Sequence, residues 1–134
     1  MTTYRQYNNE VMKNIFIYLT ALTLTLTGCS FLNPVSKAQD LASKGKFEEG
    51  IKILETEYKK DPNSVPIKSI LAQTYSDYGL ALCQDTEKPP NVKYPKAKEQ
   101  FAMALELNPY LTDAKDMFEM IEKIQAQLSE SMIN

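Results

Sequence analysis

The chain has 134 residues, a formal net charge of −2 and 43% hydrophobic residues. This length and composition predict one small globular domain and exclude a largely disordered chain. Basic and acidic residues nearly balance (15 and 17) and no basic face stands out, so we expect no nucleic-acid partner. There is no histidine, which excludes Ser-His-Asp and Cys-His nucleophiles and His-ligated zinc.

The N-terminal region has the pattern of a secretory signal. An uncharged apolar stretch, Ile15 to Leu26, follows Arg5 and Lys13. It is shorter than the roughly 20 apolar residues that span a membrane, whereas a basic region followed by a short apolar region is typical of a signal peptide. We therefore predict that residues 1–28 are a signal peptide. Met12 is an alternative start, because the stretch that begins there is a compact signal by itself.

The tetrapeptide Leu26-Thr27-Gly28-Cys29 ends this segment. It resembles the lipobox of bacterial lipoproteins, in which the peptide is cut before a cysteine that carries acyl chains. The resemblance implies that Cys29 is the lipidated mature N-terminus, and two or more chains anchor a protein stably to a membrane. It further implies a location in the cell envelope, and Ser30 favours an outer membrane facing the periplasm where two membranes exist. The alternatives are an ordinary cleaved signal and a cytosolic protein with an apolar arm.

The remainder of the chain predicts an all-α domain over residues 35–128. Apolar residues recur at helical spacing in five segments, after a short tether over 29–34. We expect Gly45 to end the first helix, Asn63 or Ser64 to cap the third, and Pro95 to lie in the first turn of the fourth. The expected segments are 35–45, 47–60, 67–84, 95–107 and 114–128, with a polar insertion at about 85–93 and a frayed tail over 129–134.

The helical pattern resembles the tetratricopeptide repeat (TPR). Its clearest match is Leu71-Ala72-x-x-Tyr75 followed by Tyr94, Ala97, Phe101, Ala104 and Pro109, and a looser unit comprises Ala38, Leu41, Gly45, Phe47, Gly50, Leu54 and Pro62. Pro62 and Pro109 are about 47 positions apart, against a repeat of about 34, which indicates an insertion of roughly 13 residues. The resemblance implies a short α-solenoid of two helix hairpins and a C-terminal capping helix.

The resemblance also implies a binding face, because TPR proteins bind ligands in the groove formed by the first helix of each repeat. Gln73 and Asp77 are its strongest candidates, since they are central and polar. The full set of expected groove residues is Gln39, Ser43, Ser69, Gln73, Ser76, Asp77, Asp116, Met120 and Lys123. A solvated helix face is the alternative for each of them. The insertion is a second candidate, because Pro89-Pro90 would present an extended segment to a partner.

These observations favour a membrane-tethered module that binds an envelope protein or an extended peptide segment, with no cofactor beyond the lipid on Cys29. A self-associating scaffold, a homo-oligomer, is the first alternative. An envelope enzyme with a carboxylate site is the second, although residues such as Glu48 and Glu55 alternate with lysines as on a solvated surface. Acylation of Cys29 leaves Cys83 unpaired, and we expect Cys83 to be a small buried residue on a helix, with an intermolecular disulfide as the alternative.

Overall fold

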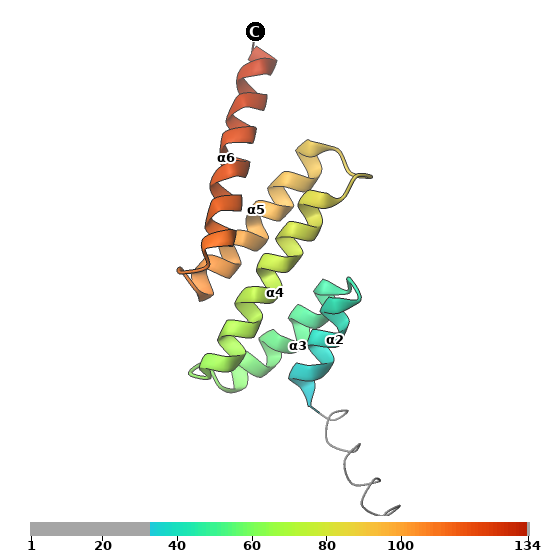
Figure 1. The fold of residues 1–134 in the computed structure, drawn as a ribbon, viewed down its shortest axis with the longest axis vertical. Coiled ribbons are helices and arrows are strands. Elements are labelled where there is room, and N and C mark those ends of the chain that lie inside the picture. The colour runs from blue at the N-terminus through green and yellow to red at the C-terminus, as the bar shows by residue number, and fades with distance from the viewer. Residues whose placement is uncertain (1–32, 134) are drawn as a thin grey trace, which may run out of the picture. The chain divides into compact units, whose positions relative to one another are not determined.

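The computed structural model describes residues 33–133, and all regular structure in this range is α-helical. The helices are α2 (Pro34–Ser43), α3 (Phe47–Lys60), α4 (Val65–Gln84), α5 (Pro90–Leu107) and α6 (Thr112–Ile133). Figure 1 shows them as successive antiparallel elements joined by short connections. The all-α prediction is confirmed for these residues. The signal peptide, Cys29 and most of the tether lie outside them.

The alternation of direction defines two ends of the domain. The start of α2 and the connections α3–α4 and α5–α6 lie at one end, and the connections α2–α3 and α4–α5 lie at the other. Helix α4 is central, because it contacts each of the other four helices. Its most extensive partner is α5, as Figure 1 also shows. A helix surrounded in this way must carry buried residues on several faces, as α4 does.

The first hairpin depends on a glycine turn. Gly45 has a φ of +77°, the left-handed conformation that glycine adopts without steric cost. The Gly45 and Lys46 amides donate to the carbonyls of Ala42 and Leu41, which satisfies the end of α2. The predicted helix end at Gly45 is therefore confirmed. At the start of α4, Ser64 occupies the expected capping position, but its side chain makes no capping hydrogen bond.

The segment 85–93 is not an extended loop. Asp85 Oδ1 accepts hydrogen bonds from the amides of Glu87 (2.9 Å) and Lys88 (3.3 Å), and Lys93 Nζ donates to the Asp85 carbonyl at 2.8 Å. The connection is therefore a five-residue turn, and α5 begins at Pro90. Proline fits this position because its fixed φ suits the first helical residue.

The early start of α5 corrects two predictions, the place of Pro95 in the helix and the extent of the polar insertion. Pro95 is the sixth residue of the helix rather than part of its first turn, so one backbone hydrogen bond is lost inside α5. The expected insertion at about 85–93 is partly helical, because its residues from Pro90 onward belong to α5. Helix α6 continues to Ile133, beyond Leu128, where the last predicted helical segment ends.

The core lies between the helices and consists of both large and small side chains. Its largest fully buried residues are Phe101, Leu54, Leu71 and Ile121. Burial of one such side chain contributes roughly 1.5–3 kcal/mol. Fully buried alanines on several helices leave room for close helix approach, and they are Ala38, Ala72, Ala97, Ala104 and Ala114.

Candidate functional site

A surface hollow of about 530 Å³ lies between α2 and α4. Its lining includes five of the residues expected on the groove face: Gln39, Ser43, Ser69, Gln73 and Asp77. The remaining lining residues are Ala42, Phe47, Ile70 and Thr74. The five expected groove residues are all exposed, whereas the four remaining lining residues are buried or half-buried. The hollow therefore has an apolar base and a polar rim.

Helical spacing brings these side chains to one face. Gln39 and Ser43 are four residues apart on α2, and Ser69, Gln73 and Asp77 repeat at the same interval on α4. Residues at i and i+4 lie above one another on a helix, so each helix contributes one row to the rim. The contact between α2 and α4 places the two rows opposite each other across the hollow.

An aromatic pair supports one wall of the hollow. Phe47, the first residue of α3, stacks on Tyr78 of α4 with ring centroids 5.3 Å apart and an interplanar angle of 16°. Such pairs contribute about 0.5–1.5 kcal/mol beyond their area burial. Thr74 donates its hydroxyl to the Ile70 carbonyl at 2.8 Å, so this buried side chain is satisfied within α4.

The rim carries one charge. Among the nine residues that line the hollow, Asp77 alone is ionisable as an acid or a base. Gln73 Nε2 donates to Asp77 Oδ1 at 2.9 Å, which orients both side chains. The other carboxylate oxygen and the Gln73 carbonyl remain able to accept hydrogen bonds. This arrangement suits a ligand that donates hydrogen bonds or carries positive charge.

The structure does not place every expected groove residue in this hollow. Ser76 is only 2% exposed and is part of the packing around α4, which follows from the contacts of α4 on several sides. Its predicted place on the groove surface is wrong. Met120, Lys123 and Asp116 are exposed on α6 and do not line the hollow.

A second hollow lies between α3 and α5, where the sequence predicted only a solvated surface. It measures about 660 Å³, and an adjoining one of about 190 Å³ shares Glu55, Tyr75 and Met103 with it. Its base is formed by residues of α4 that include Tyr75, Tyr78 and Leu82. Tyrosines in an apolar row of α4 were a signal for this site, because a buried tyrosine requires a partner for its hydroxyl.

Both tyrosines donate to glutamates of α3. Tyr75 Oη donates to Glu55 Oε1 at 2.6 Å, and Tyr78 Oη donates to Glu48 Oε1. Burial and these hydrogen bonds raise the pKa of Tyr78 to about 12 and raise the pKa of Tyr75 further. The hydroxyls therefore stay protonated at neutral pH and hold the two carboxylates in fixed positions.

Cys83 and Asp85 lie next to each other near the α4–α5 connection. Burial raises the pKa of the half-buried Cys83 thiol, so its reactive thiolate form is disfavoured. The hydrogen bond from Lys88, together with those from the Glu87 and Lys88 amides, lowers the pKa of Asp85. This connection is a closed polar turn, which argues against the extended binding segment that the sequence suggested.

Within residues 33–133, no set of three or more Cys, Asp and Glu side chains is arranged to hold a metal ion. The same part of the chain contains no helix with the length and apolar character needed to cross a membrane. Comparison with protein-family models, with curated proteins and with solved structures finds no match.

Proposed function

We propose that the chain is a lipid-anchored interaction protein of the bacterial cell envelope, and that its helical domain binds an extended segment of a partner protein. One observation carries this proposal. Gln39, Ser69, Gln73 and Asp77, the polar residues expected on a single binding face, line one hollow between two helices. An apolar base with a few convergent polar groups is the usual composition of a binding site.

The repeat architecture is part of the proposal. We assign α2–α3 and α4–α5 to two TPR-like repeats and α6 to a capping helix. Antiparallel order and fully buried alanines at the helix contacts support this assignment. Stacked hairpins need a terminal element that shields the last apolar face, and Ile121 of α6 is fully buried.

The chemistry of the rim indicates the kind of segment that binds. The Gln73 amide and the serine hydroxyls of the rim pair with peptide groups, which every protein segment offers. Asp77 adds a charge that selects a lysine or arginine side chain, because hydrogen bonds between ionised groups are the stronger ones. We therefore propose a partner segment with a basic residue flanked by apolar residues.

Membrane attachment is assigned to Cys29 from the sequence alone. Lipid at this position holds the domain in the envelope, on the periplasmic face of the outer membrane where two membranes exist. In this proposal the protein assembles or positions other proteins, and no residue is assigned a catalytic role.

Self-association is the second candidate function, and a specific observation favours it. Met120 and Leu128 of α6 are 45% and 40% exposed, which leaves an apolar row on a terminal helix. A concentration series by analytical ultracentrifugation tests this candidate. A dimer that is lost in Met120→Glu supports it, and a monomer over the whole series contradicts it.

Photo-crosslinking in cells tests the primary proposal. A photoreactive amino acid replaces Gln73 on the rim, and the control replaces Ala102, which is exposed on α5 and lines none of the hollows described above. One discrete envelope protein crosslinked from position 73, absent from position 102 and reduced by Asp77→Asn, supports the proposal. Equal adducts from both positions, or none from position 73, contradict it.

A further inference from the structure

The start of α2 fixes which end of the domain lies near the proposed lipid anchor. Five peptide units separate Cys29 from Pro34, and a fully extended chain spans at most about 3.6 Å per residue, or roughly 18 Å in total. Helix α4 alone has 20 residues, which corresponds to about 30 Å. The end of the domain at which α2 begins is therefore held close to the membrane. This inference depends on the lipid anchor of the proposed function.

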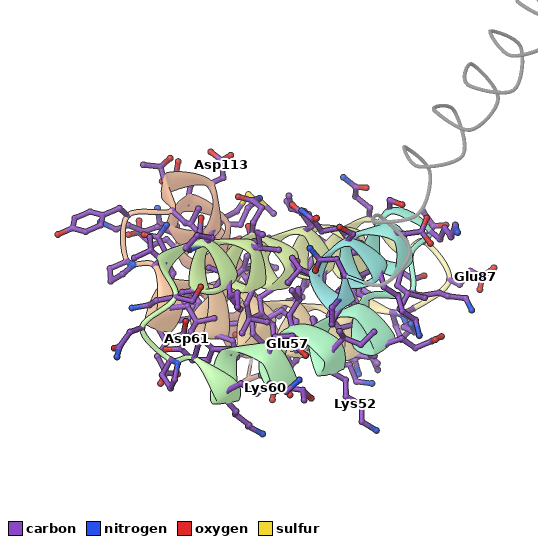
Figure 2. The ribbon with its side chains drawn as sticks, turned by 90° about the horizontal axis from the view of Figure 1, so that it is seen from below. Lys52, Glu57, Lys60, Asp61, Glu87 and Asp113 are labelled. Atoms are coloured by element: carbon purple, nitrogen blue, oxygen red, sulfur yellow. The ribbon has the colours of Figure 1, made fainter. Side chains whose placement is uncertain are left out.

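Lysines gather around that end of the first three helices. Lys37 lies in the first turn of α2, Lys59 in the last turn of α3 and Lys68 in the first turn of α4. None of the three forms an ion pair with another described residue. A fourth lysine, Lys60, pairs with Glu57 at 2.6 Å. Figure 2, which views this end, shows Glu57, Lys60 and Asp61 together where α3 ends.

The opposite end of the hairpins differs. Its connections contain Lys44, Lys46 and Lys88, and each forms an ion pair with a nearby carboxylate, at 2.7, 3.5 and 2.9 Å respectively. The lysines near the start of α2 thus have charge available for another partner. Carboxylates lie at the same end as these lysines, because Asp61 is in the α3–α4 connection, Glu106 is in the last turn of α5 and Asp113 is in the first turn of α6, where Lys115 follows it.

Two exposed apolar side chains lie at the same end as these lysines. Val65 begins α4 and is 75% exposed, and Tyr110 in the α5–α6 connection is 89% exposed. They are the most exposed large hydrophobic residues of the described chain. Tyrosine is suited to a membrane interface, because its ring is apolar and its hydroxyl is polar.

We propose that this end of the domain, defined by Lys37, Lys59, Lys68, Val65 and Tyr110 and here named the tether end, contacts an anionic lipid surface. The lysines bind the negative headgroups, because an anionic lipid surface attracts basic side chains within a Debye length of it. Val65 and Tyr110 enter the headgroup region. The lipid anchor limits the distance of the domain from the membrane. The contact of the tether end fixes the orientation of the domain relative to the membrane plane.

Tryptophan fluorescence tests the proposal cleanly, because the chain contains no tryptophan. The acylated mature protein, which begins at Cys29, is reconstituted into vesicles of phosphatidylcholine and phosphatidylglycerol that include brominated lipid. Val65→Trp reports on the tether end, and Glu87→Trp reports on the opposite end. We expect a blue-shifted, quenched emission for Val65→Trp and an emission typical of water for Glu87→Trp.

Charge variants extend the test. In the Val65→Trp background, substitution of Lys37, Lys59 and Lys68 by Gln lowers the quenching to the level of Glu87→Trp. The matched control substitutes Lys52, Lys96 and Lys123, which changes the net charge equally at exposed positions away from the tether end. Figure 2 shows Lys52 projecting away from the body of the domain. Quenching that is absent in Val65→Trp, equal in both tryptophan variants or equally lowered by both lysine sets overturns the proposal.

Mass spectrometry of the same samples separates this inference from the proposed function. A Cys29 without acyl chains contradicts the proposed membrane attachment itself. An acylated Cys29 together with an unquenched Val65→Trp contradicts the contact of the tether end alone. Far-ultraviolet circular dichroism of each variant confirms that it is folded.

Discussion

The Tyr75 hydroxyl and the Glu55 carboxylate form a 2.6 Å hydrogen bond that joins α4 to α3. Tyr75 is 5% exposed, and Glu55 lies at the edge of the hollow between α3 and α5. The bond connects the two helical hairpins of the domain through a buried donor and a carboxylate. It therefore couples the packing of the hairpins to the shape of a surface hollow.

Removal of this hydroxyl is expected to destabilise the protein. Tyr75→Phe keeps the ring in the core but leaves Glu55 without its donor, and hydrogen bonds to charged groups contribute about 1.5–3 kcal/mol. We expect the free energy of unfolding in urea to fall by about 1–2 kcal/mol, because Glu55 regains part of its hydration. In the double variant Tyr75→Phe/Glu55→Ala the losses are less than additive, because either single change already removes the hydrogen bond. Strict additivity of the two single changes would show that the hydrogen bond contributes nothing.

Alkaline pH is expected to weaken the fold through the tyrosines. The pKa of Tyr78 is raised from 10.0, the ordinary value for tyrosine, to about 12. The folded state therefore keeps a proton that the unfolded state loses above pH 10, so this group's contribution to stability is present below pH 10 and lost as the pH rises through 12. Urea unfolding at pH 8, 10 and 11.5 measures this loss. Tyr78→Phe reduces the pH dependence, and an unchanged dependence in that variant contradicts the assignment.

Gly79 provides the space for Phe101. A Cβ at position 79 would lie 2.8 Å from the Phe101 ring, and Phe101 is fully buried. Alanine gains helix propensity of up to about 1 kcal/mol over glycine, whereas overpacking of a core costs about 1–3 kcal/mol. We expect Gly79→Ala to be net destabilising in thermal unfolding. Phe101→Leu in the same chain relieves the contact, so the double variant is less destabilised than the sum of the single changes.

Ile121 attaches α6 to the remainder of the domain. It is fully buried, and Lys98 strengthens the same contact by pairing with Glu122 at 2.8 Å. Truncation of a buried isoleucine to alanine costs about 2–5 kcal/mol. We expect Ile121→Ala to increase amide hydrogen exchange in α6 more than in α2. Glu122→Ala is the control, since an exposed ion pair contributes at most about 1 kcal/mol.

The proposed lipid anchor at Cys29 predicts a simple fractionation result. Cys29→Ser removes the thiol that is proposed to carry the acyl chains, and we expect the variant protein to be released from the membrane fraction. Cys83→Ser is the matched control and leaves the distribution unchanged, because this thiol lies in the helical domain. Retention of the Cys29→Ser protein in the membrane fraction contradicts lipid anchoring at this position.

The polar residues that line the hollow between α2 and α4 were largely predictable, because their shared face depends on local periodicity. Residues spaced by four along α2 and α4 share a face in any helix, so Gln39, Ser69, Gln73 and Asp77 follow from the sequence once the helices are assigned. Ser76 was misplaced because its burial depends on how many neighbours surround α4. The hollow between α3 and α5 was missed for a related reason. The sequences of the two helices do not show how far apart the helices lie in the fold.

The sequence by itself determined the five helical segments of the described chain, the glycine turn at Gly45 and the rows of side chains on each helix. These features depend on interactions between residues a few positions apart, and local spacing encodes them. The tertiary structure alone decided that Tyr75 and Tyr78 pair with glutamates of α3. The sequence pattern also did not predict that Asp85 closes the α4–α5 connection or that α5 begins at Pro90. Those outcomes depend on contacts between groups distant in the chain or on competition between a turn and a helix, which apolar periodicity does not record.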